Sequence, residues 1–242
     1  GTMSGGEDGS IGDGGGMDRP GDRIGPYTLV SRIGSGGFGT VWLAERREPM
    51  LQRVAIKLIS GQSYGRDAVE RFNQARQALA VMDHPNIARV FDGGTTAAGR
   101  PYFVMEYVAG KPLTLYCDDE RLSIRERLGL FITVCDAVQH AHHKGIIHRD
   151  IKPGNVLVET IDGRPMAKVI DFGLSRAFAT ADGRSIATET GEIVGTLIYM
   201  SPEQCTGDPR AVDVRSDVFA LGAVLYELLT GRQPRTFEGV PL

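Results

Sequence analysis

The segment GSGGFGTV, residues 34–41, places the strongest constraint on how this chain can fold. Its glycines stand between two strand-like runs, YTLVSRIG and TVWLAERRE, so the segment predicts a β-hairpin whose backbone can approach another group closely because no Cβ intervenes. No Gly-Lys-Ser/Thr follows, which excludes a Walker A loop, and no helix opens here, which argues against a dinucleotide-binding Rossmann unit. By itself, the segment fits a polyphosphate-binding hairpin and a plain turn equally well.

The hydrophobic periodicity changes along the chain from that of strands to that of helices. Apolar residues three or four positions apart in ERFNQARQALAVM predict a helix that His84-Pro85-Asn86 ends, and a long amphipathic helix ends at Gly145. The predicted strands are 27–34, 40–48, 53–60, 87–94 and 101–108, and the predicted helices are 70–83, 124–145 and 215–230. Strands first and helices later predict an α+β fold in two lobes.

Composition excludes several classes of protein. Residues 1–26 hold ten glycines and almost no bulky apolar side chains, so they predict a disordered leader. A net charge of −3 gives no reason to expect nucleic acid or an anionic membrane as partner. The three cysteines form no CxxC pair, which suits a reducing, cytoplasmic location. The longest apolar run, VFALGAVLYELL, is too short to cross a bilayer.

Three further segments carry reactive side chains. In HRDIKPGN, Asp150 can accept a hydroxyl proton, Lys152 can neutralise charge beside it, and Asn155 can ligate a divalent cation. In DFG, Asp171 has the character of a hard-cation ligand. In VAIK, Lys57 can clamp a phosphate, although a lysine there can also merely extend its stem from an edge strand.

In this order and spacing, the four motifs resemble those of the eukaryotic-type (Hanks-type) protein kinases, and the resemblance covers about residues 27–240. It implies a two-lobed fold, with an N-lobe at 27–107 and an incomplete C-lobe at 108–242, and ATP with Mg²⁺ in the cleft. The implied catalytic residues are Lys57, Asp150, Lys152 and Asn155, and the implied metal ligands are Asn155 and Asp171.

The same resemblance implies where ATP would lie. The glycine-rich hairpin would cover the phosphates, and Lys57 would bind the α- and β-phosphates. Adenine would lie between Val41 and Ala55 above and Leu157 below, with its edge on the backbone past a gatekeeper-like Met105. The implied cofactor-binding residues are Ile33, Gly34, Ser35, Gly36, Gly37, Phe38, Gly39, Val41, Ala55, Lys57, Glu106, Val108, Leu157 and Asp171.

Other residues resemble the serine/threonine branch of the family and its bacterial members. Lys152 is typical of that branch, and GTLIYMSPE resembles its substrate-docking loop, where Thr196 would meet Asp150 and Lys152. Asp217 resembles the helix residue that braces the catalytic loop, and DHPNIARVFDGG and YMSPEQ resemble bacterial sequences. The implied partner is a protein substrate with a Ser or Thr acceptor, and a second copy of the chain could serve through self-association or autophosphorylation.

A polar stretch at 176–196 predicts an exposed loop. The resemblance implies that Arg149 pairs with a phosphate on this loop, since a guanidinium facing phosphate oxygens can order a segment. A merely polar, flexible loop explains the same composition. The candidate acceptors are Thr180, Ser185, Thr188 and Thr190.

The chain departs from the family pattern at Ala75. The family carries a helix glutamate here that pairs with the strand lysine, and Leu79 fits the apolar residue one turn on. Gln74 lies about 100° round the helix and Glu70 points the opposite way, so neither is a simple substitute. We therefore expect an impaired kinase or, as the alternative, an ATP-binding pseudokinase or interaction module without turnover. The family also continues with further helices, so the last predicted helix is expected to need another cover.

Two other interpretations of reactive side chains are weaker. QHAHHK carries His140, His142 and His143, but no Cys or carboxylate stands at metal-ligand spacing, and the resemblance places ordinary helix surface here. Cys135 and His148 do not suit a thiol nucleophile pair, because Cys135 falls inside a helix and is typical of a core residue.

Overall fold

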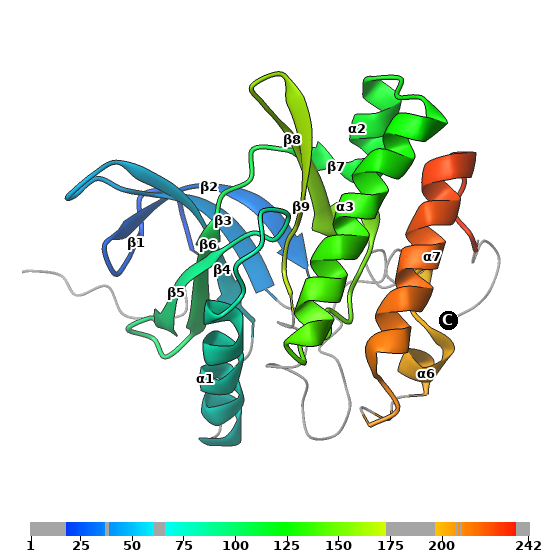
Figure 1. The fold of residues 1–242 in the computed structure, drawn as a ribbon. Helices are drawn as coiled ribbons and strands as arrows, with labels where there is room; N and C mark the ends of the chain where they lie inside the picture. Colours follow the sequence, from blue (N-terminus) through cyan, green and yellow to red (C-terminus); the bar gives the residue numbers. More distant parts are fainter. Residues whose placement is uncertain are drawn as a thin grey trace, which may run out of the picture.

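The computed structural model describes residues 18–36, 39–60, 66–172, 197–206, 208 and 210–235 (Figure 1). Its N-terminal part is an antiparallel sheet of six strands in the order β1-β2-β3-β4-β6-β5, with helix α1 packed beside β5. These elements are β1 (Arg23–Ile24), β2 (Tyr27–Gly36), β3 (Gly39–Arg46), β4 (Gln52–Ile59), α1 (Arg66–Ala80), β5 (Val90–Thr95) and β6 (Pro101–Glu106).

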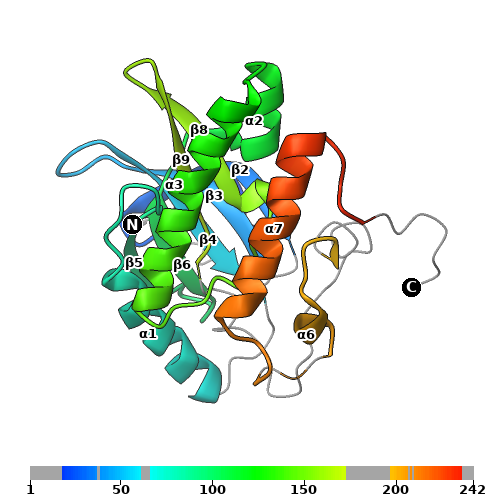
Figure 2. The same ribbon diagram turned by 45° about the vertical axis from the view of Figure 1, so that its right-hand side comes forward.

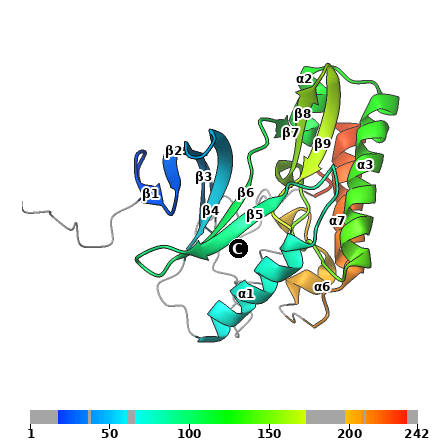
Figure 3. The same ribbon diagram turned by 60° about the vertical axis from the view of Figure 1, so that its left-hand side comes forward.

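The C-terminal part is mainly helical. Helices α3 and α7 lie side by side, with a small sheet in the order β7-β8-β9 on the other side of α3 (Figures 1 and 2). Figure 3 shows the two parts apart, with β1–β6 and α1 opposite β7–β9, α2, α3 and α7. The elements are β7 (Lys111–Pro112), α2 (Leu113–Asp119), α3 (Ile124–His143), the 3₁₀ turn η1 (Pro153–Asn155), β8 (Val156–Ile161), β9 (Arg164–Val169), α6 (Pro202–Cys205) and α7 (Val214–Thr230).

Local sequence explains where the long helices begin and end. Ser123 caps α3 through a capping box with Glu126, and the chain leaves that helix through Gly145 at a φ of +72°. Asp213 caps α7 by accepting from the Arg215 amide, and Gly231 ends that helix in the left-handed conformation.

Buried apolar side chains form two clusters. The smaller one lies within the N-terminal sheet and includes Trp42 and Val104. The larger one runs from Phe103 in that sheet, past α1, to Val134 on α3 and Val224 on α7. One continuous core therefore spans both parts of the fold and fixes the elements that carry the polar loops between them.

Backbone hydrogen bonds also join the two parts. The Ala88 amide donates to Val169 O at 2.9 Å, and the Val169 amide donates to Asn86 O at 2.8 Å. The turn after α1 therefore pairs directly with the end of β9. Nearby, Lys144 Nζ after α3 donates to Val81 O at 2.7 Å.

The predicted α+β class is confirmed, while the predicted disordered leader is corrected at its end. Residues 1–17 lie outside the described residues, but β1 pairs with β2 and Ile24 is buried. Asp18 also pairs with Arg100 at 2.7 Å. One buried apolar side chain and one ion pair tie this short segment to the sheet, and the glycine-rich composition of 1–26 hid both.

Candidate active site

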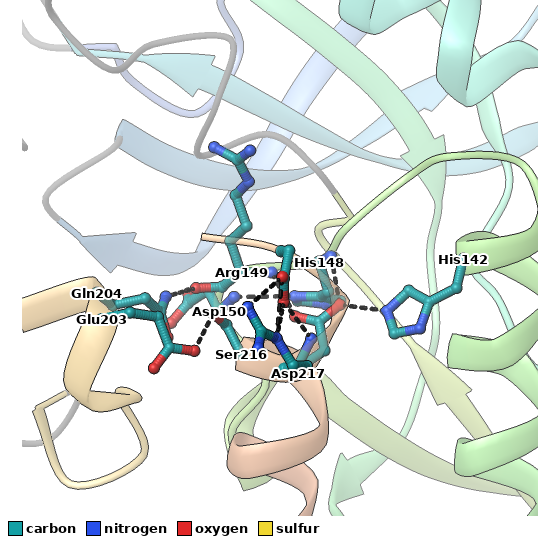
Figure 4. A network of polar contacts seen from close by, with 10 residues as sticks. His142, His148, Arg149, Asp150, Glu203, Gln204, Ser216 and Asp217 are labelled. Atoms are coloured by element: carbon teal, nitrogen blue, oxygen red, sulfur yellow. Dashed lines mark hydrogen bonds and ion pairs between the residues drawn. The ribbon is translucent and has the colours of Figure 1, made fainter. Parts of the chain in front are cut away.

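The loop between α3 and β8 carries the HRDIKPGN motif, and a buried carboxylate on α7 fixes its backbone (Figure 4). Asp217 is fully buried, and its two oxygens accept from the His148 amide and the Arg149 amide, each at 2.8 Å. His142 Nε2 on α3 approaches the same carboxylate at 2.7 Å. Burial raises the pKa of Asp217, but the bond to His142 and those to the two amides outweigh it, so the pKa lies below its ordinary value.

Within this loop, three of the four predicted catalytic side chains meet. Asn155 Nδ2 donates to the Asp150 carbonyl at 2.7 Å and to its carboxylate at 2.9 Å. Lys152 Nζ lies 3.1 Å from Asp150 Oδ2. The carboxylate of Asp150 is therefore held in place from two sides. The Lys152 ammonium next to it can offset negative charge.

His148 connects this loop to the DFG segment. The Asp150 amide donates to His148 Nδ1 at 3.2 Å, so Nε2 carries the proton and donates to Ile170 O at 2.9 Å. The imidazole also packs against the Phe172 ring in a tilted arrangement, with ring centroids 4.6 Å apart. The Ile170 amide donates to Asn155 O at 2.9 Å. Because Asp171 follows Ile170, this hydrogen bond holds the backbone of Asp171 close to that of Asn155.

Lys57 on β4 takes its carboxylate partner from Asp171 rather than from α1. Lys57 Nζ lies 2.7 Å from Asp171 Oδ2, and both side chains are largely buried. Ala75 is half-buried and packs against the core, whereas Glu70 and Gln74 are exposed. Among the described residues, the position expected for the helix carboxylate therefore holds a methyl group that contacts apolar neighbours.

The residues expected around adenine lie on adjoining strands. Register pairs Val41 with Lys57 and Ala55 with Met105, so these side chains occupy neighbouring positions on β3, β4 and β6. Leu157 comes from β8 in the other sheet and is half-buried. Val41, Ala55 and Met105 therefore belong to the N-terminal sheet and Leu157 to the C-terminal one. Their contact with adenine stays a prediction.

Glu106, at the end of β6, links that junction to β9. Its carboxylate lies 2.7 Å from Lys168 Nζ and accepts from the Arg89 amide at 3.2 Å. Lys168 is buried, and it stands three positions before Asp171. The pair therefore connects the segment expected to face adenine with the strand that leads to Asp171.

The glycine-rich hairpin is described at its base. Gly37 and Phe38 lie outside the described residues. Gly39 has a φ of +140°, and a Cβ there would lie 1.9 Å from Leu58 O, so only glycine fits against the neighbouring strand. At this position the sheet itself requires the glycine, whatever the hairpin binds.

Helix α6 lies beside the start of α7 and contacts the catalytic loop. Ser216 Oγ donates to Glu203 Oε1 at 2.6 Å, and this bond lowers the pKa of the Glu203 carboxyl. Gln204 Nε2 donates to Arg149 O at 2.7 Å. Thr196 and the candidate phosphorylation sites Thr180, Ser185, Thr188 and Thr190 lie outside the described residues.

Two residues of this network escaped the sequence analysis. His142 was assigned to ordinary helix surface, and that assignment was wrong, because its ring contacts the buried Asp217. Helical spacing carried the signal, since Val134, Val138 and His142 follow one another at intervals of four and the first two are buried. Gln204 gave no comparable signal, because its partner is a backbone carbonyl far away in sequence.

A β-sheet followed by helices, with a lysine–aspartate pair beside a loop that a buried aspartate braces, is the arrangement of the protein kinase class. The family model described as protein kinase domain matches residues 27–239. The chain therefore belongs to the protein kinase domain family.

Its relatives are bacterial serine/threonine kinases. The chain is 40% identical over 222 residues to the serine/threonine-protein kinase Pkn1 of Myxococcus xanthus, which covers 91% of this chain and 31% of Pkn1. It is 39% identical over 227 residues to the serine/threonine-protein kinase PknB of Mycobacterium tuberculosis, which covers 91% of this chain and 35% of PknB. The chain thus spans about a third of the length of these relatives.

A solved structure has the same fold. The crystal structure of the M. tuberculosis PknI kinase domain matches with a TM-score of 0.68 at 26% identity, over 93% of this chain and 80% of that one. Within the described residues, no helix combines the length and apolar character that crossing a membrane requires.

Proposed function

We propose that this chain is an ATP- and Mg²⁺-dependent protein serine/threonine kinase domain whose turnover is lowered by Ala75. The observation that carries the proposal is the convergence of Asp150, Lys152 and Asn155 beside the Lys57–Asp171 pair. Because ATP is the phosphoryl donor, the proposed activity belongs in the cytoplasm.

The residues present fit a metal–nucleotide complex. Asp171 offers carboxylate oxygens, and Asn155 offers Oδ1, since its Nδ2 is already engaged with Asp150. Oxygens of this kind are the ligands that Mg²⁺ prefers. Lys57 supplies a largely buried positive charge for phosphate oxygens. When bound, ATP with Mg²⁺ supplies the transferable γ-phosphoryl group.

The chain's own residues then have distinct tasks. Asp150 accepts a hydrogen bond from the substrate hydroxyl, orients it, and takes its proton late in the transfer. Lys152 offsets the negative charge that gathers beside Asp150, and Asn155 holds the Asp150 carboxylate in place. Phosphorylation within 176–196 would regulate the domain, because Arg149 would form an ion pair with the phosphate and so order that segment.

Ala75 limits this chemistry. With no carboxylate on α1, Lys57 depends on Asp171, the same residue proposed to hold magnesium. One carboxylate then serves two cations, which weakens the positioning of the phosphates.

We predict that Ala75→Glu raises the rate of phosphoryl transfer at least tenfold, because it returns a dedicated partner to Lys57 and frees Asp171 for the metal. Transfer is measured with labelled ATP and a basic protein substrate. Gln74→Glu, which places the same charge on the exposed face of α1, is the matched control and leaves the rate unchanged. No transfer by the Ala75→Glu chain would contradict the kinase proposal.

A second candidate function is an ATP-binding pseudokinase that acts by binding alone. The apolar setting of Ala75 and the Lys57–Asp171 pair favour it. It predicts that ATP with Mg²⁺ raises the melting temperature while neither the native chain nor Ala75→Glu transfers phosphate. Transfer by either chain excludes it.

A further inference from the structure

The backbone next to the proposed base Asp150 is held in an uncommon conformation. Arg149 has a φ of +70°, in the left-handed region that side-chain-bearing residues seldom adopt. Such a conformation persists only where its surroundings determine it, and it is concentrated at functional sites. The question is which groups hold the Arg149 backbone.

Two side chains from different elements hold it, one on each side (Figure 4). Asp217 Oδ1 on α7 accepts from the Arg149 amide at 2.8 Å. Gln204 Nε2 on α6 donates to the Arg149 carbonyl at 2.7 Å. That carbonyl belongs to the same peptide group as the Asp150 amide. The hydrogen bond from Gln204 therefore fixes the orientation of the peptide plane between Arg149 and Asp150.

Gln204 is itself fixed at its other end. Its Oε1 accepts from both the amide and the hydroxyl of Ser201, each at 3.1 Å. Ser201 is fully buried, and the neighbouring Glu203 is bonded to Ser216, which precedes Asp217. The contacts Glu203–Ser216, Asp217–Arg149 and Arg149–Gln204 therefore close a ring through α6, α7 and the catalytic loop.

We propose that Gln204 is a positioning residue that couples the segment 197–206 to Asp150. The inference rests on the proposed function, because Asp150 matters through its contact with the substrate hydroxyl. The Asp217 side of the ring is buried in the core, whereas the Gln204 side follows directly after the segment predicted to dock the substrate. Movement of 197–206 is thus transmitted to the peptide plane before Asp150.

The variant Gln204→Glu tests this positioning role without disturbing the N-cap of α6, which Ser201 and residue 204 form together. A glutamate keeps the acceptor that Ser201 uses, since Ser and Glu three positions apart form the usual capping box, but it cannot donate to Arg149 O. Gln139→Glu, the same change at an exposed position on α3, is the matched control. Gln204→Met, which removes donor and acceptor together, serves as the second variant.

The first readout is hydrogen exchange of the Arg149 and Asp150 amides by NMR in the full chain without nucleotide. We expect exchange about five- to tenfold faster in Gln204→Glu and Gln204→Met, as for the loss of one hydrogen bond, and unchanged in Gln139→Glu. Unchanged exchange at these two amides in both Gln204 variants would overturn the proposal. Loss of the fold in one variant leaves the other to decide.

The second readout is kinetic and uses the Ala75→Glu background. Adding Gln204→Met lowers kcat there and leaves KM for ATP unchanged, because the nucleotide contacts are intact. A change in KM alone would contradict a role at Asp150. Absence of transfer in the Ala75→Glu parent would count against the proposed function, while the exchange measurement would still decide the role of Gln204.

Discussion

At the scale of single residues, Asp217 shows how one buried carboxylate organises a loop. Its carboxylate accepts hydrogen bonds from two backbone amides and contacts His142, and the residue is fully buried. A buried charge is tolerated only when it is hydrogen-bonded in this way. Its stability contribution therefore depends on its remaining ionised.

We predict that Asp217→Asn lowers the free energy of unfolding by about 2–4 kcal/mol at neutral pH, because the bonds to a charged acceptor are lost. The pKa of Asp217 is lowered in the folded chain, so its contribution is complete above the ordinary value near 4 and is lost as pH falls through the folded pKa. Urea unfolding at a series of pH values should show the gap between the two chains narrowing below about pH 4. A gap that widens there would contradict this account.

The grouping of three reactive side chains in one loop could be predicted from sequence, because the motif places them at fixed spacing between buried runs. Asp150, Lys152 and Asn155 converge in the way their shared segment implied. His142 and Gln204 could not be predicted in the same way. The partner of His142 lies on α7 and the partner of Gln204 lies in the catalytic loop, both far away in sequence. Helical spacing indicates that His142 faces the core, but it does not identify the partner.

At the scale of elements, prediction succeeded where periodicity is long. Helices α3 and α7 repeat their apolar spacing over several turns, and β2 to β4 are long strands around the glycine-rich segment, so their existence followed from sequence. The short elements β1, β7, α2 and α6 did not. The helix α2 follows Pro112 without a side-chain cap, so tertiary packing rather than local signals stabilises it.

The link between β6 and β9 provides a second prediction. The Lys168–Glu106 pair is mostly buried, whereas the Lys111–Asp119 pair has similar length but is about half exposed. Lys168→Met should therefore lower the free energy of unfolding by about 1–3 kcal/mol, because it leaves the Glu106 carboxylate without its cationic partner, and Lys111→Met should leave the free energy of unfolding nearly unchanged. Denaturant unfolding of both variants checks this. Equal effects would contradict a special role for the buried pair.

At the scale of the whole molecule, the α+β class and the order of the parts followed from the change in periodicity along the chain. The way the two parts join could not be predicted from that periodicity, because it depends on backbone hydrogen bonds between the turn after α1 and β9. The proposed nucleotide site draws on both parts, with Lys57 from one and Asp171 from the other. Binding there should stabilise the molecule as a unit.

We predict that ATP with Mg²⁺, at about 100 times its Kd, adds about 2.7 kcal/mol to the free energy of unfolding. The melting temperature should rise by about 5–10 °C. Chelating the magnesium should remove most of that rise, and Asp171→Asn should remove the magnesium-dependent part, since it takes away the carboxylate of the two proposed ligands. Asp119→Asn, at an exposed position, is the control. An equal rise with and without magnesium would contradict the proposed metal site.

The backbone pairing of Asn86 and Ala88 with Val169 also governs how the molecule can flex. These two hydrogen bonds resist sliding of one part past the other at this point, so we expect a change in the separation of the two parts to turn about it. Asp171, two positions beyond Val169, sits near the axis and is displaced little.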